Sequence, residues 1–473
     1  MYESTTKSCT QNGVRGGSST THFPFWHKEI QDILVLKNNR GTDDNRVRKM
    51  DYSIQFCRLF YRRFVNNEKI TLFSPHEVQD LYDAFGHDND KFEELYEQYE
   101  RSRTIWKKQV KARDLFNAFC QERIGTGRMY VMNIDHCNDH SSFTDPVRMS
   151  NLCQEITLPT SPLNHIDDDD DTESEIALCV LSAINIGAIK KLDEIQGICD
   201  NIVRSLDYVI EYQFYPVKAS LKMKKRRSIG VGITNLAYYL AKHGVTYDDP
   251  EACNVVDELM EHIQYSLIKA SVNLAKEKGA CEYFNRTKYS KGILPIDTYC
   301  KEVDKIVTRK LELDWEALRA EVKEHGMRNS TLTALMPCES SSLVTNSTNG
   351  VEPPRGLLSI KKSKQGLIPQ LVPEIYNLQK KYSLAYSLDS NKGYTNIIAT
   401  IQKYVDQAIS ANHYYNFSKY ESGNLPVAEI ARDLLYSYKM GLKTLYYANT
   451  DDGKTDNHIE QEDGDCEGGA CKL

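Results

Sequence analysis

The sequence has no apolar run long enough to cross a bilayer, and its first twenty residues lack the apolar core of a secretory signal. It also has no internal repeat and no C-x2-C pair, so the common structural zinc patterns are missing. These gaps exclude a membrane protein and predict a cytoplasmic one. In that reducing compartment the 13 cysteines would not form a disulfide scaffold, and some of the thiols could be reactive.

A basic excess is missing as well. The net charge is −7, and the segment from Asp451 to the end carries eight acidic residues against two lysines, which leaves the rest of the chain close to neutral. Such a charge balance gives no broad electrostatic surface for nucleic acid or for an anionic membrane. We therefore expect neither partner.

A chain of 473 residues with 40% hydrophobic residues has the size of about three ordinary domains or of one large barrel. Residues 1–149 read as a Gly-rich loop followed by mainly helical structure, with apolar spacing typical of helices over 51–65 and 110–123. Residues 150–449 contain short apolar runs between helices. Residues 450–473 turn polar and acidic, which predicts a flexible tail.

Two apolar runs, Ile176–Ala183 and Thr331–Met336, are compatible with buried strands. A long helix is predicted between them, with Asp249 as its N-cap, Pro250 in its first turn and Gly279 at its end. The acidic run 167–171 reads as a solvated loop. Strands separated by helices indicate an α/β fold with a mainly parallel sheet.

The stretch SNLCQEITLP places Asn151, Cys153 and Glu155 at alternate positions. In a straight strand these residues would share a face but spread over roughly 13 Å, so the segment must bend into a loop if all three are to reach one small ligand. The plainer alternative is a buried cysteine beside a surface glutamate. Cys179, inside IALCVLSA, could likewise be an ordinary core residue.

In STLTALMPCESSSLVTN a strand ends near Pro337, and a Ser-rich turn begins a helix at Glu339, Ser340 and Ser341. Backbone N–H groups and hydroxyls at a helix start suit a phosphate, although an ordinary N-cap explains them equally well. The Gly-rich CTQNGVRGGS offers Gln11 and Arg15 to a nucleotide, which alone is a weak signal.

The adjacent Tyr446 and Tyr447 could form a relay, but consecutive strand residues point to opposite faces, so a stacked pair requires a break in the strand. The cluster of His136, Cys137 and His140 fits no common zinc spacing, and we assign no metal there.

Taken in order, ten stretches resemble the large subunit of the class Ia ribonucleotide reductases, which reduce ribonucleoside diphosphates to deoxyribonucleotides. They are CTQNGVRGG, LVLKNNRG, MDYSIQ, TLFSPHEV, SNLCQE, EIALCVLSA, RNSTLTALMP, TNGVEPPRG, TLYYANT and CEGGAC. The resemblance covers nearly all of this chain but only the C-terminal part of the family's large subunit. It implies the second half of a ten-stranded α/β barrel with its finger loop, surrounded by helices and followed by a flexible tail.

The resemblance also implies roles. Cys153 would hold a transient thiyl radical, Glu155 would act as base toward the sugar 3′ hydroxyl, and Asn151 would hydrogen-bond the sugar. Cys179 would be one of two cysteines that supply electrons. The terminal Cys466 and Cys471 would reduce the resulting disulfide by thiol exchange, which explains a dithiol at the end of a flexible tail.

The remaining implied roles concern substrate and radical transfer. Glu339, Ser340 and Ser341 match the family's diphosphate-binding turn, whereas Cys338 replaces the usual serine, which puts its side-chain contribution in doubt. Tyr446 and Tyr447 would pass the radical inward from a small subunit that bears a di-iron tyrosyl radical. Gln11 and Arg15 would lie on the loop that, in the family, links the effector site to the substrate base, and would contribute to substrate binding.

The resemblance leaves the second redox cysteine and the first half of the barrel upstream of this chain. We therefore expect a companion N-terminal large-subunit fragment, a small radical subunit, dNTP or ATP effectors, and thioredoxin or glutaredoxin as reductant, with no cofactor bound by this chain itself. Two alternatives remain: a non-catalytic partner that stabilises a reductase complex, and a simple thiol–disulfide carrier.

Overall fold

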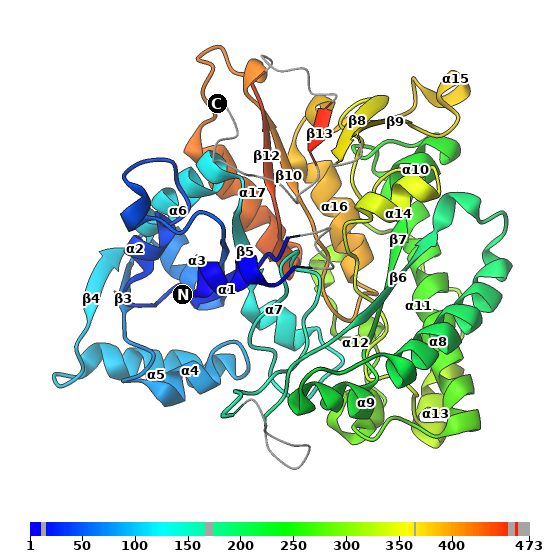
Figure 1. Cartoon of the computed structure of the whole chain (residues 1–473), viewed down its shortest axis with the longest axis horizontal. Coiled ribbons are helices and arrows are strands. Elements are labelled where there is room, and N and C mark those ends of the chain that lie inside the picture. The colour runs from blue at the N-terminus through cyan, green and yellow to red at the C-terminus, as the bar shows by residue number, and fades with distance from the viewer. Residues whose placement is uncertain (11–15, 166–173, 364–365, 453–458, 462–473) are drawn as a thin grey trace.

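The computed structural model describes residues 1–10, 16–165, 174–363, 366–452 and 459–461 (Figure 1). Helices and strands follow one another along the chain, which confirms the expected mixed α/β class. None of the described helices has the length and apolar character needed to cross a membrane. Within the described residues the strands form five sheets of two to four strands, and none of these closes into a barrel.

The largest sheet contains four strands in the order β1–β2–β5–β11. Strands β1 (Thr20–Pro24), β2 (Asp51–Phe56) and β5 (Met129–Asn133) are parallel, and β11 (Thr444–Leu445) pairs antiparallel with β5. All residues of β2 and β5 are buried. Parallel strands covered on both faces have this continuous burial, so the sheet lies inside the core.

The helix predicted over 51–65 is wrong in its first half. Residues 51–56 form β2, and helix α3 spans only Arg58–Val65. Tyr52, Ile54 and Phe56 are apolar at a spacing of two, which is the period of a strand. Because the helical spacing begins only after Cys57, a window over the whole segment mixes two periods.

A second group of strands carries the predicted buried runs. Strand β6 (Val180–Asn185) pairs parallel with β7 (Ile229–Thr234), so it begins four residues later than the run starting at residue 176 suggests. The run 331–336 is extended but makes single bridges only, from Thr333 to Val231 and from Leu335 to Ile409. An apolar run shows where a strand can lie but not which residues find a partner.

Glycine in β7 permits close packing beside Cys179. A Cβ atom at Gly230 would lie 2.6 Å from Leu181 Cδ2, and 3.0 Å from both Ala334 Cβ and the sulfur of Cys179. Backbone without a side chain therefore lets these groups approach one another. Cys179 consequently lies directly against β7.

The long predicted helix is confirmed as α11 (Glu251–Lys278). The N-cap is Pro250 and not the predicted Asp249, although Asp249 Oδ1 accepts a hydrogen bond from the Glu251 backbone N–H at 2.9 Å. Gly279 ends the helix with φ +83°, as expected. The helix packs against α8 (Ile195–Tyr212), α13 (Trp315–His325) and α16 (Asn391–Gln402). Helix α6 (Ala112–Thr126) corresponds to the helix predicted over 110–123.

The other elements surround these sheets. The further helices are α1 Tyr2–Ser8, α2 Ile30–Leu34, α4 Gln79–Ala84, α5 Asn89–Arg101, α7 Ile134–Asp139, α9 Lys222–Arg226, α10 Leu236–His243, α12 Pro295–Thr298, α14 Glu339–Val344, α15 Ile375–Leu378 and α17 Val427–Lys439. The further strands are β3 Lys69–Leu72, β4 Lys108–Lys111, β8 Leu358–Ser363, β9 Gly366–Leu371, β10 His413–Asn416, β12 Ala448–Asp451 and β13 Ile459–Gln461.

The predicted three regions are linked by strand pairing. β11 belongs to the second region but pairs with β5 of the first. Within the segment predicted to be a flexible tail, β12 continues to Asp451 and β13 pairs parallel with β8. These pairings do not test whether 149 and 449 are domain boundaries, which stay predictions.

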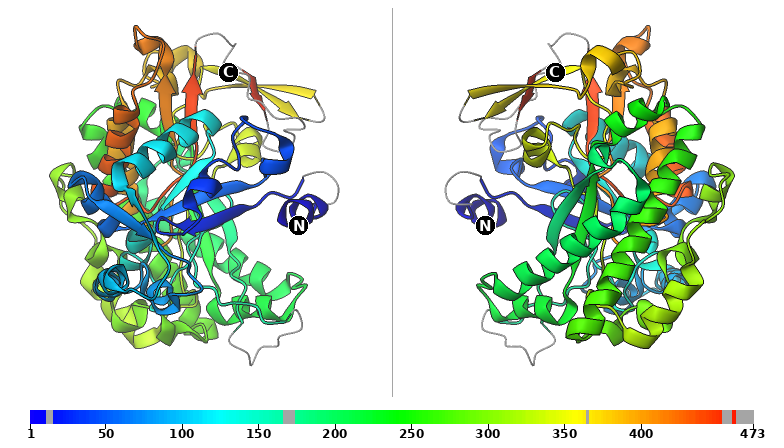
Figure 2. Two further views of the ribbon diagram at one scale, coloured as in Figure 1. Left: turned by 90° about the vertical axis from the view of Figure 1, so that its left-hand side faces the viewer. Right: turned by 90° about the vertical axis from the view of Figure 1, so that its right-hand side faces the viewer.

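Two elements extend from one side of the molecule. Helix α1, which has no buried residue, and the β8–β9 hairpin both project in the same direction (Figure 2). In the hairpin, Leu358, Leu367 and Leu371 are exposed. This side of the molecule thus presents apolar side chains that nothing in the described structure covers.

Candidate active site

The segment after Ser150 bends into a tight loop, as the sequence requires for its three chemical residues to come together. Gln154 has φ +71°, in the left-handed region, and its backbone N–H donates to Asn151 O at 3.3 Å. The Asn151 side-chain Oδ1 accepts from the Ile156 backbone N–H at 3.0 Å. The predicted bend is confirmed, and Asn151, Cys153 and Glu155 lie on one turn of chain.

Glu155 is buried and bound by a serine from a distant segment. The Ser410 hydroxyl lies 3.1 Å from Glu155 Oε2 and 2.6 Å from the backbone oxygen of Cys153. Burial raises the pKa of the Glu155 carboxyl, while hydrogen bonds from its own backbone N–H, from Asn151 and from Ser410 act in the opposite direction. The carboxyl group therefore holds its proton more firmly than an exposed glutamate does.

Cys179 lies in the same environment. Gln407 Nε2 donates to the Cys179 sulfur at 3.6 Å. Burial raises the pKa of the Cys179 thiol to about 12, the bond from Gln407 lowers it, and the Glu155 carboxylate raises it further. Gln407, which contacts Cys179, lies three residues before Ser410, which contacts Glu155, so one segment of chain holds both predicted groups.

A buried segment, residues 407–413, joins all these parts, and we call it the seam. Its residues are all buried. Besides Gln407 and Ser410, the Ala408 backbone N–H donates to Glu155 O at 2.9 Å. The Leu335 backbone N–H donates to Ala408 O at 3.1 Å, and the Ser410 backbone N–H donates to Leu335 O at 3.0 Å. The seam thus connects the cysteine loop with the segment that leads to the Ser-rich turn.

The same seam holds the tyrosine pair. Tyr446 N–H donates to Ala411 O at 2.7 Å, and Tyr447 N–H donates to Asn412 Oδ1 at 3.0 Å. Sequence reasoning missed the seam entirely. The available signal was a set of polar residues, Gln407, Ser410, Asn412 and His413, interspersed with apolar ones, because buried polar side chains need specific partners.

Tyr446 and Tyr447 stack in a break between β11 and β12, as their predicted pairing demands. Their hydroxyl oxygens are 2.6 Å apart, and their ring centroids are 3.8 Å apart with an angle of 39° between the ring planes. Tyr446 is buried and Tyr447 is half-buried. The pair therefore leads from the partly exposed phenol to the inner one.

A third tyrosine, which the sequence did not single out, belongs to this cluster. The ring centroid of Tyr130 on β5 lies 4.8 Å from that of Tyr446 and 5.8 Å from that of Tyr447. Its hydroxyl donates to Asp51 Oδ2 at 3.0 Å. Burial raises the pKa of Tyr130 well above its usual value, Asp51 and Tyr447 add to the rise, and Cys153 also contributes. The predicted radical cysteine and the tyrosine cluster are joined through consecutive seam residues, because Ser410 contacts Cys153 O and Ala411 O accepts from Tyr446 N–H.

The predicted phosphate turn lies at the start of α14. Glu339, Ser340 and Ser341 are exposed in its first turn, and Asn349 Nδ2 donates to Glu339 Oε1 at 2.9 Å. Cys338 is buried, and its sulfur contacts the Ile233 backbone oxygen of β7 at 3.6 Å. The Cys338 side chain is therefore buried beneath the turn, where its thiol also hydrogen-bonds Ser341.

The histidine cluster is used for packing. His140 contacts Thr298 Oγ1 at 2.8 Å and Gln402 O at 2.7 Å, and His136 stacks on Tyr438. The Cys137 sulfur donates to Lys443 O at 3.7 Å. Within the described part of the chain, no group of three or more His, Cys, Asp or Glu side chains is arranged to hold a metal ion.

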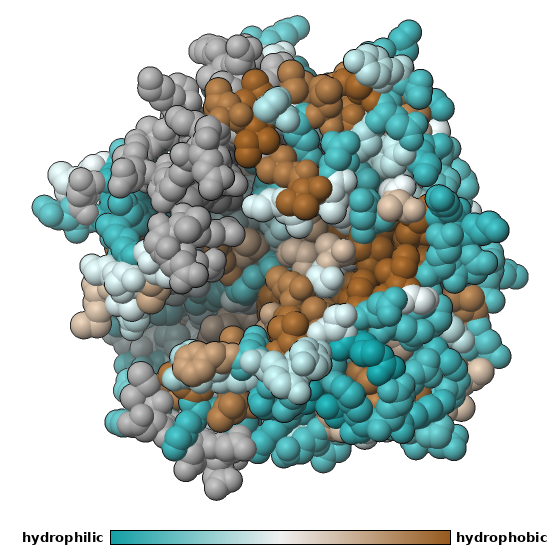
Figure 3. Space-filling view, turned by 45° about the vertical axis from the view of Figure 1, so that its right-hand side comes forward, coloured by the Kyte–Doolittle hydropathy of each residue, from teal (hydrophilic) through white to brown (hydrophobic). Residues whose placement is uncertain are grey.

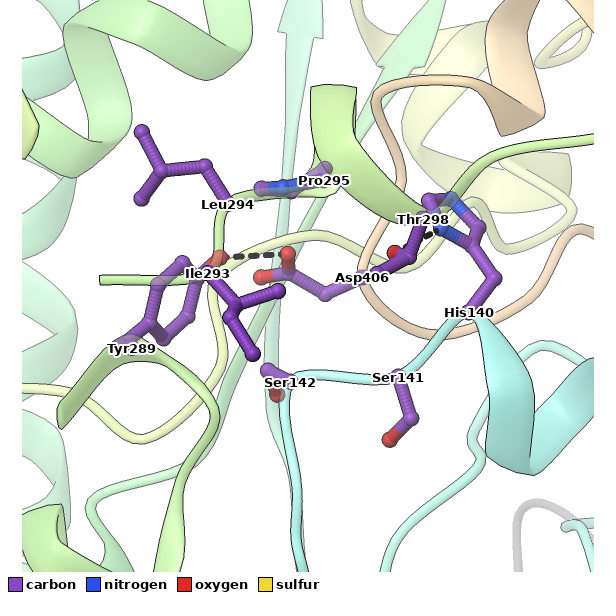
Figure 4. A pocket seen from close by; sticks show the side chains of 9 residues that line it. All are labelled: His140, Ser141, Ser142, Tyr289, Ile293, Leu294, Pro295, Thr298 and Asp406. Carbon is purple, nitrogen blue, oxygen red and sulfur yellow. Dashed lines mark hydrogen bonds between the residues drawn. The ribbon is translucent and has the colours of Figure 1, made fainter. Parts of the chain in front are cut away.

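A small pocket lies beside His140, and one of its lining residues is Asp406 (Figure 4). Asp406 accepts from the Tyr289 hydroxyl at 2.6 Å. None of the predicted site residues lines this pocket. The pocket is therefore separate from the predicted site residues.

Some predicted residues lie outside the described ones. Gln11 and Arg15 of the Gly-rich loop, the acidic run 167–171, and the terminal Cys466 and Cys471 all fall there. Their proposed roles rest on the sequence alone.

The seam thus brings Cys153, Cys179, the buried carboxyl group of Glu155 and the stacked phenols together in one α/β protein. A family model described as "Ribonucleotide reductase, barrel domain" matches residues 1–382 and 372–448. The chain belongs to this family.

Relatives named ribonucleoside-diphosphate reductase subunit alpha match the whole chain. The Haemophilus influenzae protein is 54% identical over 476 residues, and this chain covers 62% of it. The alpha subunit of reductase 1 from Escherichia coli is 51% identical over 481 residues, and the Enterobacteria phage T4 protein is 46% identical over 483 residues. This chain covers 63% of each of these two relatives. The chain thus spans somewhat less than two thirds of these relatives.

Proposed function

We propose that this chain acts in the reduction of ribonucleoside diphosphates to deoxyribonucleoside diphosphates, as part of a ribonucleotide reductase large subunit. One observation carries the proposal: the Ser410 hydroxyl contacts both Cys153 O and the Glu155 carboxylate, while Gln407 of the same seam contacts the Cys179 sulfur. In the balanced reaction a dithiol and a ribonucleoside diphosphate give a disulfide, a deoxyribonucleoside diphosphate and water.

The loop residues divide the work on the sugar. Cys153, as a thiyl radical, would take the hydrogen atom from the 3′ carbon and later return it. Glu155 would accept the proton of the 3′ hydroxyl, and Asn151 would hydrogen-bond the sugar. The raised pKa of Glu155 supports this role, because a base that must also return its proton works best with a pKa closer to neutrality.

Radical entry would use the stacked tyrosines. A hydroxyl separation of 2.6 Å allows a hydrogen atom to pass from one phenol to the other with little movement. Tyr447 is the more exposed ring and would receive the oxidising equivalent, and Tyr446 would pass it on toward Cys153. A di-iron tyrosyl radical in a separate small subunit would supply that equivalent.

Cys179 would provide electrons together with a second cysteine, which the resemblance places in the N-terminal part of the large subunit. The disulfide formed between them would be reduced by Cys466 and Cys471, and these in turn by thioredoxin or glutaredoxin. The substrate diphosphate would bind at Glu339, Ser340 and Ser341, with dNTP or ATP effectors acting through Gln11 and Arg15.

The partner that completes the site would be an N-terminal large-subunit fragment. The chain covers 62–63% of its relatives, and β6, next to Cys179, has side chains that are mostly only half-buried. Apolar side chains also gather across the middle of one face, with polar ones to the right of them and below (Figure 3). An uncovered strand with apolar surface is a ready site for pairing with another segment.

The test of the catalytic assignment is a Cys153→Ser variant in the complex reconstituted with the N-terminal fragment and the small subunit. Deoxyribonucleotide formation should vanish, because a hydroxyl cannot replace the thiyl. Cys300→Ser is the matched control, since Cys300 is also half-buried and contacts Lys439 O instead. Full activity of Cys153→Ser would instead identify a non-catalytic structural partner of a reductase.

The test of the companion is the purified chain itself. With only the small subunit and a dithiol it should form no deoxyribonucleotide, because one redox cysteine is absent. Turnover under those conditions would show that the chain needs no N-terminal fragment.

A further inference from the structure

Gln407 contacts the sulfur of Cys179 through a fixed amide orientation. Its Nε2 lies 3.6 Å from Cys179 Sγ and 3.2 Å from the backbone oxygen of Ile229. A carbonyl oxygen can only accept, so the amide nitrogen and not the amide oxygen must face Ile229. The nitrogen's second hydrogen is then available to the sulfur. The amide is thereby set as a donor to Cys179.

The side chain has no freedom to turn away. Gln407 is fully buried, and its Oε1 has no hydrogen-bond partner among the described residues, although both donor contacts of the same amide are made. Because only the donor contacts of this amide are made, the amide is oriented to donate hydrogen bonds.

The backbone around Gln407 is held from several sides. The buried ammonium group of Lys443 donates to Gln407 O at 2.5 Å, to Asp406 O at 2.7 Å and to Val405 O at 3.2 Å. Gln402 Nε2 also donates to Gln407 O, at 3.1 Å, and the Gln407 N–H donates to Thr333 O at 3.1 Å. A displaced Gln407 would break several buried hydrogen bonds.

We propose that Gln407 stabilises negative charge on the sulfur of Cys179 and so tunes this cysteine as a redox group. Hydrogen bonds to an ionised acceptor are roughly twice as strong as neutral ones, so the contact strengthens when the sulfur becomes a thiolate. Among the described charged groups, Glu155 acts on the same sulfur and opposes its ionisation. Gln407 is therefore the group that counters both burial and Glu155.

The inference rests on the proposed redox role of Cys179 and gives Gln407 a defined step. When a thiolate attacks the disulfide that contains Cys179, at the other sulfur, the S–S bond breaks and its electron pair moves to Cys179. A new S–S bond forms between the attacking sulfur and the former partner. The Gln407 N–H meets the charge on the Cys179 sulfur, which then takes a proton from solvent. Better stabilisation of the leaving sulfur makes this exchange faster.

The experiment measures iodoacetamide alkylation of Cys179 in the full chain between pH 7 and 9.5, by peptide mass spectrometry. Gln407→Met keeps the volume but removes the donor, and should raise the thiol pKa by about one unit. The thiolate fraction falls about tenfold, but a more basic thiolate is also more nucleophilic, so the net rate should fall about three- to fourfold.

Controls separate this effect from a change of structure. Gln55 is the matched residue, because its Nε2 also lies 3.6 Å from a sulfur, the non-ionising thioether of Met132; Gln55→Met should leave Cys179 alkylation unchanged. The buried Cys57, Cys120 and Cys199 report folding in the same sample, since they should stay unlabelled. Gln407→His, which can present an N–H at a similar position, should restore most of the rate.

An unchanged Cys179 rate in folded Gln407→Met overturns the inference. If the buried cysteines of that variant become labelled, Gln407→Glu decides the matter: its acceptor oxygens should also slow Cys179, and a wild-type rate would contradict the proposal. Alkylation needs no reductase turnover, so a rate that falls as expected in a chain whose reconstituted complex makes no deoxyribonucleotide would overturn only the proposed function.

Discussion

Strands β2 and β6 are both apolar, parallel strands of one chain, yet they differ in burial. All residues of β2 are buried, whereas in β6 only Ile184 is. β2 has β1 and β5 on its two sides, and β6 pairs with β7 alone among the described strands. The difference teaches that β2 completes its own core, while one edge of β6 has no partner among the described strands. Because Cys179 directly precedes β6, the proposed redox cysteine lies next to that unpaired edge.

The largest effect on stability should come from β2, which is paired on both edges. Phe56→Ala removes a ring that is 2% exposed and lies 4.6 Å and 5.2 Å, centroid to centroid, from Phe60 and Phe119. The free energy of unfolding should fall by about 3–5 kcal/mol. Leu181→Ala on β6, which is 40% exposed, should cost about 1 kcal/mol or less in the isolated chain. Urea unfolding followed by circular dichroism measures both, and equal losses would break the comparison.

The next largest effect concerns binding of the proposed N-terminal fragment at the unpaired edge of β6. Leu181→Lys should weaken binding of the N-terminal fragment by about tenfold or more, because a charge would be buried in the new contact, while leaving the isolated chain folded. Leu311→Lys is the control, since Leu311 is 39% exposed and equally large. Calorimetric titration gives both affinities. Equal affinities for the two variants would place the fragment elsewhere.

The smallest effect concerns the hydrogen bond between Ser410 and Glu155. The Ser410 hydroxyl lowers the pKa of Glu155 by hydrogen-bonding its ionised form, so Ser410→Ala should raise that pKa further, by up to about one unit. A higher pKa leaves less carboxylate at a given pH, and the acid limb of the reconstituted complex's kcat should move to higher pH. Ser330→Ala, a fully buried serine that pairs with Ser228, should leave the limb in place. A limb that moves to lower pH in Ser410→Ala would contradict the assignment of Glu155 as base.

Local patterns predicted the local features of this molecule. The N-cap, apolar face and final glycine of α11 are encoded within one helix, and the need for a bend at Gln154 and for a break at Tyr446 follows from the two-residue period of strands. The helix predicted from residue 51 failed because Tyr52, Ile54 and Phe56 follow a different period from the residues after them.

The seam could not be predicted in this way, because its meaning lies in contacts over long sequence distances. Ser410 is more than 250 residues from Cys153 and Glu155, and Gln407 is 228 residues from Cys179. Tyr130 gave no signal either, since a tyrosine on a buried strand looks like any core aromatic until Tyr446 packs against it. The resemblance implied roles for Cys153, Glu155 and Cys179 but did not identify Ser410 and Gln407, which contact them.

The most direct test of the central claim is disulfide mapping after one turnover. The reconstituted complex, with Cys466→Ser and Cys471→Ser to prevent re-reduction, would be quenched with acid, alkylated and digested for mass spectrometry. The account predicts that Cys179 is linked to a cysteine of the N-terminal fragment in an amount equal to the deoxyribonucleotide formed. Deoxyribonucleotide formation with Cys179 still a free thiol would contradict it.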